Sequence, residues 1–71
     1  MKRRWIAVVQ WIDSTDDSSF DADEIQVFAE TPEAARSAAA RQWRLTIGAQ
    51  WPALRLEKIV IYTPAQHRAI A

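Results

Sequence analysis

The sequence predicts a single small α+β domain, residues 1–71, with the element order β-β-α-β and a short helix expected at the C-terminus. Three observations carry this prediction. Apolar residues alternate over 3–12, 24–30 and 54–62, which is typical of strands. An alanine-rich stretch with helical periodicity lies between the second and third of these runs. The chain is 71 residues long and 49% hydrophobic, which suffices for one core.

The run from Arg3 to Ile12 is expected to be the central strand. β-Branched and aromatic residues dominate it, and these favour extended backbone. Both of its faces are apolar, as in a strand that has neighbours on either side and packing above and below. The two faces consist of Trp5, Ala7, Val9 and Trp11 on one side and Ile6, Val8 and Ile12 on the other.

Residues 13–23 read DSTDDSSFDAD, a polar stretch rich in turn-forming residues, and they predict a long loop. The second strand is expected to follow over Glu24 to Glu30. Its apolar residues recur at every second position, so one of its sides should face the core. These residues are Ile25, Val27 and Ala29.

Thr31 and Pro32 mark a helix start, because Thr is a good N-cap and Pro fits the first helical position. The helix is expected to run to about Ile47, with Gly48 ending it in the left-handed conformation. One broad face should pack on the sheet, opposite an arginine-bearing face. The inward face comprises Ala34, Ala35, Ala38, Ala39, Gln42, Trp43, Leu45 and Thr46.

Residues 54–62 are the third predicted strand, and Thr63-Pro64 repeats the helix-start signal ahead of the tail. With the doubly apolar first strand in the centre, the expected sheet is antiparallel with the order 2-1-3. One full helix covers only one face of such a sheet. The open apolar face is expected to be buried by a second copy, most simply as a two-fold dimer, or by a functional partner.

Charges are sorted along the chain although they sum to zero. Residues 1–12 carry only bases, residues 13–35 carry only acids, and residues 36–71 carry bases with the exception of Glu57. Such sorting polarises the molecule, which bears on its partners and association rates. The acids of the middle segment are Asp13, Asp16, Asp17, Asp21, Asp23, Glu24, Glu30 and Glu33.

Residue types that support catalysis are scarce in this sequence. It contains no Cys, one Gly and one imidazole, His67, which is expected in a solvated tail. Thiolate nucleophiles, thiolate metal sites and Gly-rich phosphate loops are thereby excluded. We therefore expect no enzyme, no catalytic residue, no metal and no cofactor. No apolar run approaches 18 residues and no cleavage site follows the N-terminal arginines, so a cytoplasmic protein without membrane contact is expected.

The segment Asp13–Glu24 resembles the calcium loop of the EF-hand family, which implies a calcium site. Oxygen-bearing side chains stand at loop positions 1, 3, 5, 9 and 12, and the twelfth is the expected Glu. Ser18 stands where the sharp turn of the family has Gly, and the predicted flanks are strands instead of helices. The alternative is a solvated acidic loop. The five positions are occupied by Asp13, Thr15, Asp17, Asp21 and Glu24.

The same acids are suited to binding a basic protein surface. On a surface that binds nucleic acid, they would take the place of the phosphates. The whole-chain pattern, in which an acidic segment separates two strands ahead of an Ala-rich helix, resembles short α+β proteins of phages and mobile elements, anti-CRISPR proteins among them. That resemblance implies an inhibitor that works by binding. The expected contact residues are Asp13, Asp16, Asp17, Asp21, Asp23 and Glu24, with Trp51 as an exposed aromatic anchor.

Two further functions are alternatives. Arg36, Arg41 and Arg44 form a basic helix face that suits nucleic-acid phosphates, although the zero net charge and the acidic segment oppose such binding. A structural homo-oligomer, whose function is assembly, is the other alternative.

Overall fold

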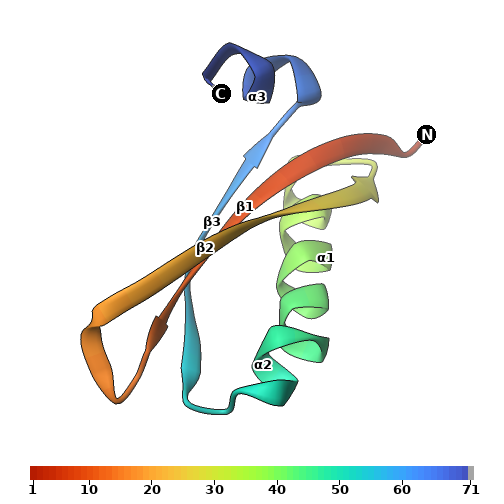
Figure 1. Ribbon diagram of the computed structural model, residues 1–71. Helices are drawn as coiled ribbons and strands as arrows, with labels where there is room; N and C mark the ends of the chain where they lie inside the picture. The colour runs from red at the N-terminus through yellow and green to blue at the C-terminus, as the bar shows by residue number, and fades with distance from the viewer. Residues whose placement is uncertain (71) are drawn as a thin grey trace.

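Three antiparallel strands carry a long helix on one face of the sheet and a short C-terminal helix on the other (Figure 1). This computed structural model describes the backbone of residues 1–70 and the side chains of residues 1–15 and 21–70. The elements are β1 (Arg3–Asp13), β2 (Asp16–Ala29), α1 (Pro32–Leu45), α2 (Ile47–Gln50), β3 (Leu54–Tyr62) and α3 (Pro64–Ile70). The predicted α+β class is confirmed.

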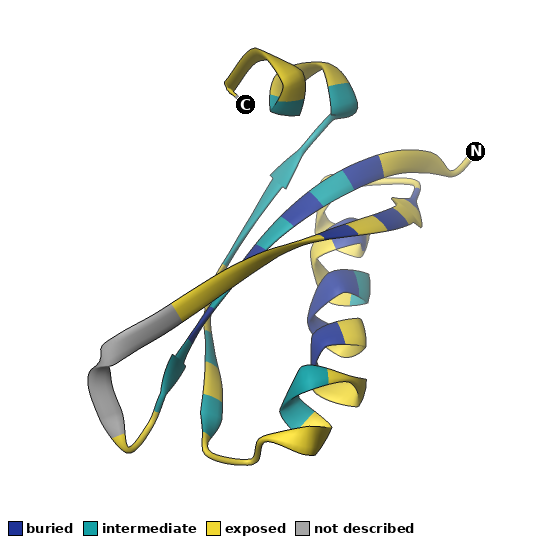
Figure 2. Cartoon of the chain, in the orientation of Figure 1, coloured by how far each residue is buried: buried dark blue, intermediate teal, exposed yellow. Residues whose placement is uncertain are grey.

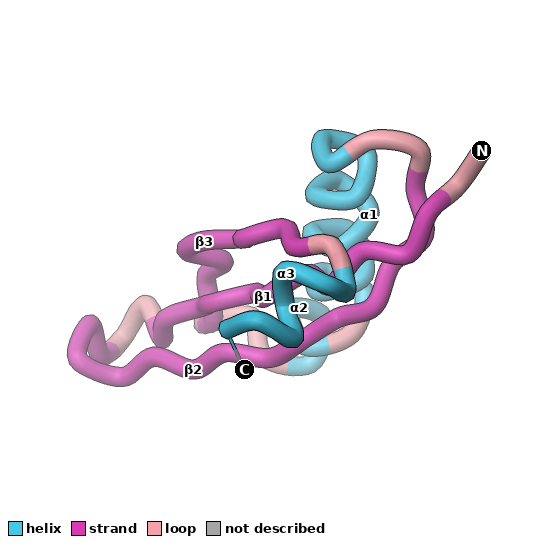
Figure 3. Tube along the Cα trace, turned by 90° about the horizontal axis from the view of Figure 1, so that it is seen from above, coloured by secondary structure: helices cyan, strands magenta, loops and turns pink. Residues whose placement is uncertain are grey.

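The sheet has the predicted order β2-β1-β3 (Figure 3), and β1 runs antiparallel to both neighbours. Its alternation matches the two neighbours in register, because Val9 lies opposite Asp23 of β2 and Ile59 of β3. In β1, the side chains at odd positions from Trp5 to Trp11 face α1 and are buried. Those of the other parity face α3 and are half-buried, which produces the banded pattern along β1 in Figure 2.

The prediction of a long loop over residues 13–23 is wrong. β1 and β2 form a hairpin in which Asp13 pairs with Asp16, so the connection consists of Ser14 and Thr15. A polar composition does not distinguish a loop from an edge strand, because the outer side of an edge strand is in water. Pairing with β1 satisfies the backbone groups of this segment. The twelve positions that resemble a calcium loop are therefore spread along a hairpin instead of closing around one point.

Helix α1 begins as predicted. The Thr31 hydroxyl accepts a hydrogen bond of 3.1 Å from the Ala34 N–H, and Pro32 occupies the first turn. The helix packs on the sheet through small residues and one large anchor, since the rings of Trp43 and Trp11 lie 6.0 Å apart between centroids. Its buried residues are Ala35, Ala39, Ala40 and Trp43.

The inward face of α1 is narrower than predicted. Ala34, Gln42 and Thr46 are exposed, and Leu45 has 67% of its surface in solvent. The helix rests on the line from Ala35 through Ala39 to Trp43, and the flank that carries Leu45 turns away from the core. Periodicity groups these residues on one side of the helix, but it does not fix how the helix is rotated about its axis against the sheet.

Gly48 does not end α1 by a left-handed turn. No described residue has a positive φ, and Gly48 lies within the short helix α2 that follows Thr46. A Cβ atom at this position would lie 3.0 Å from Cζ3 of Trp43. A side chain at position 48 would thus press on the indole ring of Trp43. The Thr46 N–H closes α1 by bonding to the Gln42 carbonyl at 3.1 Å.

The C-terminal tail forms α3 and returns over the sheet. Thr63 and Gln66 cap its start reciprocally, with bonds of 2.9 and 3.1 Å between their backbone N–H groups and each other's side chains. His67 Nε2 lies 3.0 Å from Glu24 Oε1, on the face opposite α1. The second sheet face is therefore partly covered by the chain itself, which the sequence argument did not expect. Phe28 stays 62% exposed there.

Candidate functional site

The acidic residues line the outer strand β2 instead of a loop. Asp21, Asp23 and Glu24 are all exposed on this edge strand. Asp21 and Asp23 share the parity of the buried Ile25 and therefore lie on the α1 face, whereas Glu24 lies on the α3 face. The predicted contacts Asp16 and Asp17 lie in β2, but their side chains are outside the described part of the chain. We call Asp13–Glu24 the acidic hairpin.

Two carboxylates of the acidic hairpin bond to the backbone of their own strand. The Ala22 N–H donates to Asp21 Oδ1 and the Glu24 N–H donates to Asp23 Oδ1, each at 2.8 Å. These bonds occupy two backbone N–H groups of the edge strand and orient the acids along it. The edge is thus less available for pairing with another strand, and it presents negative charge.

The turn of the acidic hairpin is joined to the segment that contains Trp51. The Ser14 N–H donates to the Ala53 carbonyl at 2.8 Å, and the Ser14 hydroxyl also donates to that oxygen. Trp51 is 61% exposed two residues before Ala53, and its carbonyl accepts from the Leu54 N–H at 3.0 Å. The structure therefore places the predicted aromatic anchor on the segment that holds the acidic turn.

Asp13 is held as a carboxylate within the turn. Its Oδ1 accepts hydrogen bonds from the Thr15 hydroxyl at 2.6 Å and from the Thr15 N–H at 2.9 Å. These bonds favour the charged form and hold the pKa of Asp13 below its ordinary value of 3.8. Because the pKa is depressed on folding, this stabilisation is present above pH 3.8 and is lost as the pH falls through the folded-state pKa.

A Thr15→Val variant is expected to raise the pKa of Asp13 towards 3.8, because the hydroxyl bond is the larger cause of its depression. An NMR titration of the Asp13 carboxyl carbon measures this change. Ser14→Ala is the control, since the Ser14 hydroxyl bonds to Ala53 and not to Asp13. An unchanged titration midpoint in Thr15→Val would contradict the assignment.

His67 is not the solvated tail residue that the sequence suggested. It is half-buried against the sheet, where its ring meets Tyr62 edge-on at 6.3 Å between centroids and its Nε2 faces Glu24. The position of α3 over the sheet brings His67 to Glu24, and no local sequence pattern predicts this contact. Among the described residues, no group of three or more His, Cys, Asp or Glu side chains is placed to hold a metal ion.

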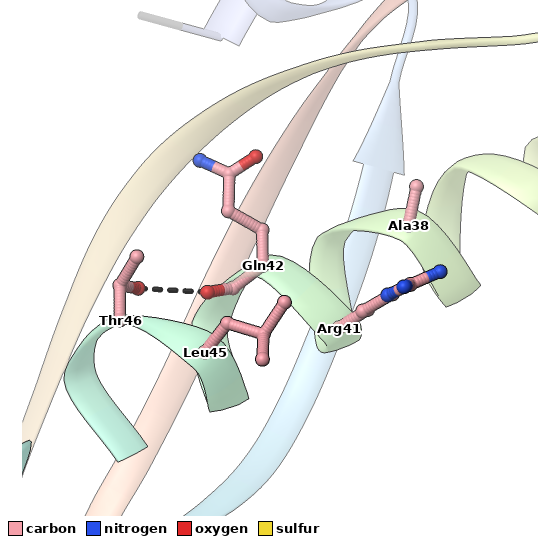
Figure 4. Close-up of a pocket in the computed structure, with 5 residues that line it drawn as sticks. All are labelled: Ala38, Arg41, Gln42, Leu45 and Thr46. Carbon is pink, nitrogen blue, oxygen red and sulfur yellow. Dashed lines mark hydrogen bonds between the residues drawn. The ribbon is translucent and has the colours of Figure 1, made fainter. Parts of the chain in front are cut away.

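The arginines of α1 lie on its solvent side. Arg36, Arg41 and Arg44 are exposed, and no described carboxylate lies within ion-pair distance of them. Beside Arg41 the helix has a hollow of about 440 Å³, lined by Ala38, Arg41, Gln42, Leu45 and Thr46 (Figure 4). Sequence reasoning missed this hollow because it placed Leu45 in the core. The signal that could have revealed it is the spacing of three and four residues between Ala38, Arg41 and Leu45 along one flank of the helix.

Comparisons with protein-family models, with curated proteins and with solved structures find no match to this chain. The longest helix within residues 1–70 is α1, with 14 residues, and none of the helices described is long and apolar enough to cross a membrane.

Proposed function

We propose that this protein is a non-enzymatic protein-binding module that acts in the cytoplasm, and that its acidic hairpin docks on the basic, nucleic-acid-binding surface of a larger protein. A phage or mobile-element inhibitor of the anti-CRISPR type would act in this way. One observation carries the proposal. Asp21, Asp23 and Glu24 are exposed on the edge strand β2, and among the described side chains their only contact with a basic residue is that of Glu24 with His67.

An ordered strand suits this role better than the loop that the sequence predicted. The β1 ladder already holds the backbone of β2, so docking orders only side chains and costs less entropy. Several negative carboxylates on one strand attract a basic partner over a distance and accelerate its association. The neighbouring exposed Trp51 supplies an apolar contact that slows dissociation after the encounter.

The test begins with the partner that the wild-type protein captures from its natural host, identified by mass spectrometry and then purified. Replacing Asp16, Asp17, Asp21 and Asp23 by Asn is expected to slow association by about tenfold or more at low salt, and by less at high salt. Stopped-flow mixing or surface plasmon resonance measures the association rate. Folding stability should change little, because exposed charges contribute little to it.

Glu57→Gln is the matched control, because it removes an acid from β3, the opposite edge of the sheet. It should leave association within about twofold of wild type, since a lone distant charge is screened. Trp51→Ala should raise the dissociation rate with little effect on association. An association rate that survives loss of the four aspartates would refute docking through the acidic hairpin.

Nucleic-acid binding through α1 is the second candidate function. It is favoured by the exposure of Arg36, Arg41 and Arg44 on one helix without a described carboxylate to neutralise them. A gel shift at about 50 mM salt tests it, since electrostatic binding is strongest at low salt. Binding should disappear when all three arginines are changed to Gln, and no shift with wild-type protein would remove this candidate.

A further inference from the structure

The hollow on α1 is an apolar surface without a described partner. Its lining residues stand three or four positions from one another along one flank of the helix, as Ala38, Arg41 and Leu45 do. Figure 4 shows Leu45 and Ala38 on this flank with Arg41 beside them. Leu45 is among the most exposed large apolar residues of the protein. An exposed leucine next to an arginine is a surface that suits a partner with both apolar and acidic groups.

Acidic residues lie on the same side of the molecule as this hollow. Asp21 and Asp23 point to the sheet face on which α1 packs, because they stand four and two positions before the buried Ile25 of the same strand. Asp21 pairs with Trp11, the residue whose ring contacts Trp43 of α1. The acids of β2 and the arginine flank of α1 therefore border the same stretch of core. Among the described side chains, Asp21 and Asp23 form no ion pair with Arg41.

We infer that this face, consisting of Asp21, Asp23, Arg41 and Leu45, pairs with the same face of a second copy across a two-fold axis. Such an interface must be complementary to itself, since each residue meets its counterpart's neighbours twice. A face with an acidic part, a basic part and an apolar residue meets this condition. The acids of one copy then lie against Arg41 of the other, and the two Leu45 side chains are covered.

The charges on this face favour a second copy over a partner of a single sign. An acidic partner drawn to Arg41 would be repelled by Asp21 and Asp23, and a basic partner that covered the whole face would be repelled by Arg41. A basic partner that binds the acidic hairpin alone leaves Arg41 and Leu45 uncovered. A zero net charge also removes long-range repulsion between two copies.

This inference does not rest on the proposed function. The two are nevertheless connected, because Asp21 and Asp23 serve both the self-pairing face and the acidic hairpin. A basic partner and a second copy should therefore compete, and dimerisation would withhold part of the docking surface until the partner displaces it.

Charge reversal tests the pairing. Arg41→Glu places acids on both halves of the face, and Asp21→Lys with Asp23→Lys places bases on both halves. Each variant alone should be monomeric, because both contacts of its two-fold pair become repulsive. Mixing the two variants should restore a dimer. One contact is then the native one, and the other joins Glu at position 41 to Lys at positions 21 and 23.

Light scattering and sedimentation at about 100 μM protein and about 50 mM salt, where charge pairs are least screened, measure the mass. Wild type and the mixture should give twice 8.1 kDa, and each variant alone 8.1 kDa. Arg36→Glu is the control for a charge change elsewhere on α1 and should stay dimeric. Circular dichroism checks the fold, and should a reversal variant unfold, Arg41→Gln and Leu45→Ser replace it, each expected to weaken the dimer about tenfold.

Three results would overturn the inference. Wild-type protein that stays at 8.1 kDa under these conditions does not pair through any face. A dimer that persists in both reversal variants pairs elsewhere, for example over Phe28. A mixture that stays monomeric while both variants are folded shows that the acids and Arg41 do not meet across the interface. None of these results bears on docking of a basic partner, which the association-rate experiment tests separately.

Discussion

A Trp43→Ala variant will lose a large part of the protein's stability, and all of it if the total lies at the lower end of the range usual for a chain of this length. Removing a buried tryptophan from a core costs roughly 3–5 kcal/mol. Domains gain only about 0.05–0.15 kcal/mol per residue, which for this chain amounts to about 4–11 kcal/mol. Trp43 is the one large residue that α1 buries. Its ring packs against the ring of Trp11 and lies beside Gly48. Denaturant unfolding monitored by circular dichroism measures the loss.

Two control variants distinguish the contribution of the buried ring from that of its indole N–H and from a general effect of substitutions in α1. The indole N–H of Trp43 is buried and has no hydrogen-bond partner among the described groups, which carries a cost of about 1–3 kcal/mol. Trp43→Phe removes that cost together with part of the ring, so its net effect should be within about 1 kcal/mol of wild type. Leu45→Ala, on the exposed flank, should change stability by less than about 0.5 kcal/mol. Equal stability of Trp43→Ala and wild type would mean that α1 does not anchor the core.

An Ala39→Leu variant is expected to destabilise the fold by about 1–3 kcal/mol, because extra methyl groups in a packed core force backbone or rotamer shifts. Ala35 and Ala39 have no exposed surface, and their small side chains set how closely α1 approaches the sheet. A longer side chain would lift the helix and loosen the Trp11–Trp43 contact. The unfolding midpoint in urea measures the effect.

Ala34→Leu is the matched control for this substitution. It places the same side chain on the same helix at an exposed position, and Leu and Ala are both good helix formers. Its stability should lie within about 0.5 kcal/mol of wild type. If Ala34→Leu and Ala39→Leu shift the midpoint equally, the close approach of α1 to the sheet is not what limits the size of residue 39.

Local signals in the sequence sufficed for the elements and their order. Alternation in β1 with apolar residues on both faces is possible in a central strand alone, so it implied the sheet order β2-β1-β3. Thr31 and Thr63 were sufficient to mark two helix starts, because a cap is a contact between residues only three positions apart. The exposure of Trp51 was also predictable locally, because Pro52 follows it and disfavours a helical conformation at Trp51.

Three features depended on contacts between distant residues, and there the sequence was not enough. The acidic segment is a strand because its backbone pairs with β1. Leu45 is solvent-exposed because α1 packs through Ala39 and Trp43, which turns Leu45 away from the sheet. The tail closed over the second face through His67 and Glu24, which are 43 positions apart in the chain (67 − 24). Local propensity sets the backbone of each segment, but which surfaces stay open is decided by the packing of segments against one another, and the candidate site consists of those open surfaces.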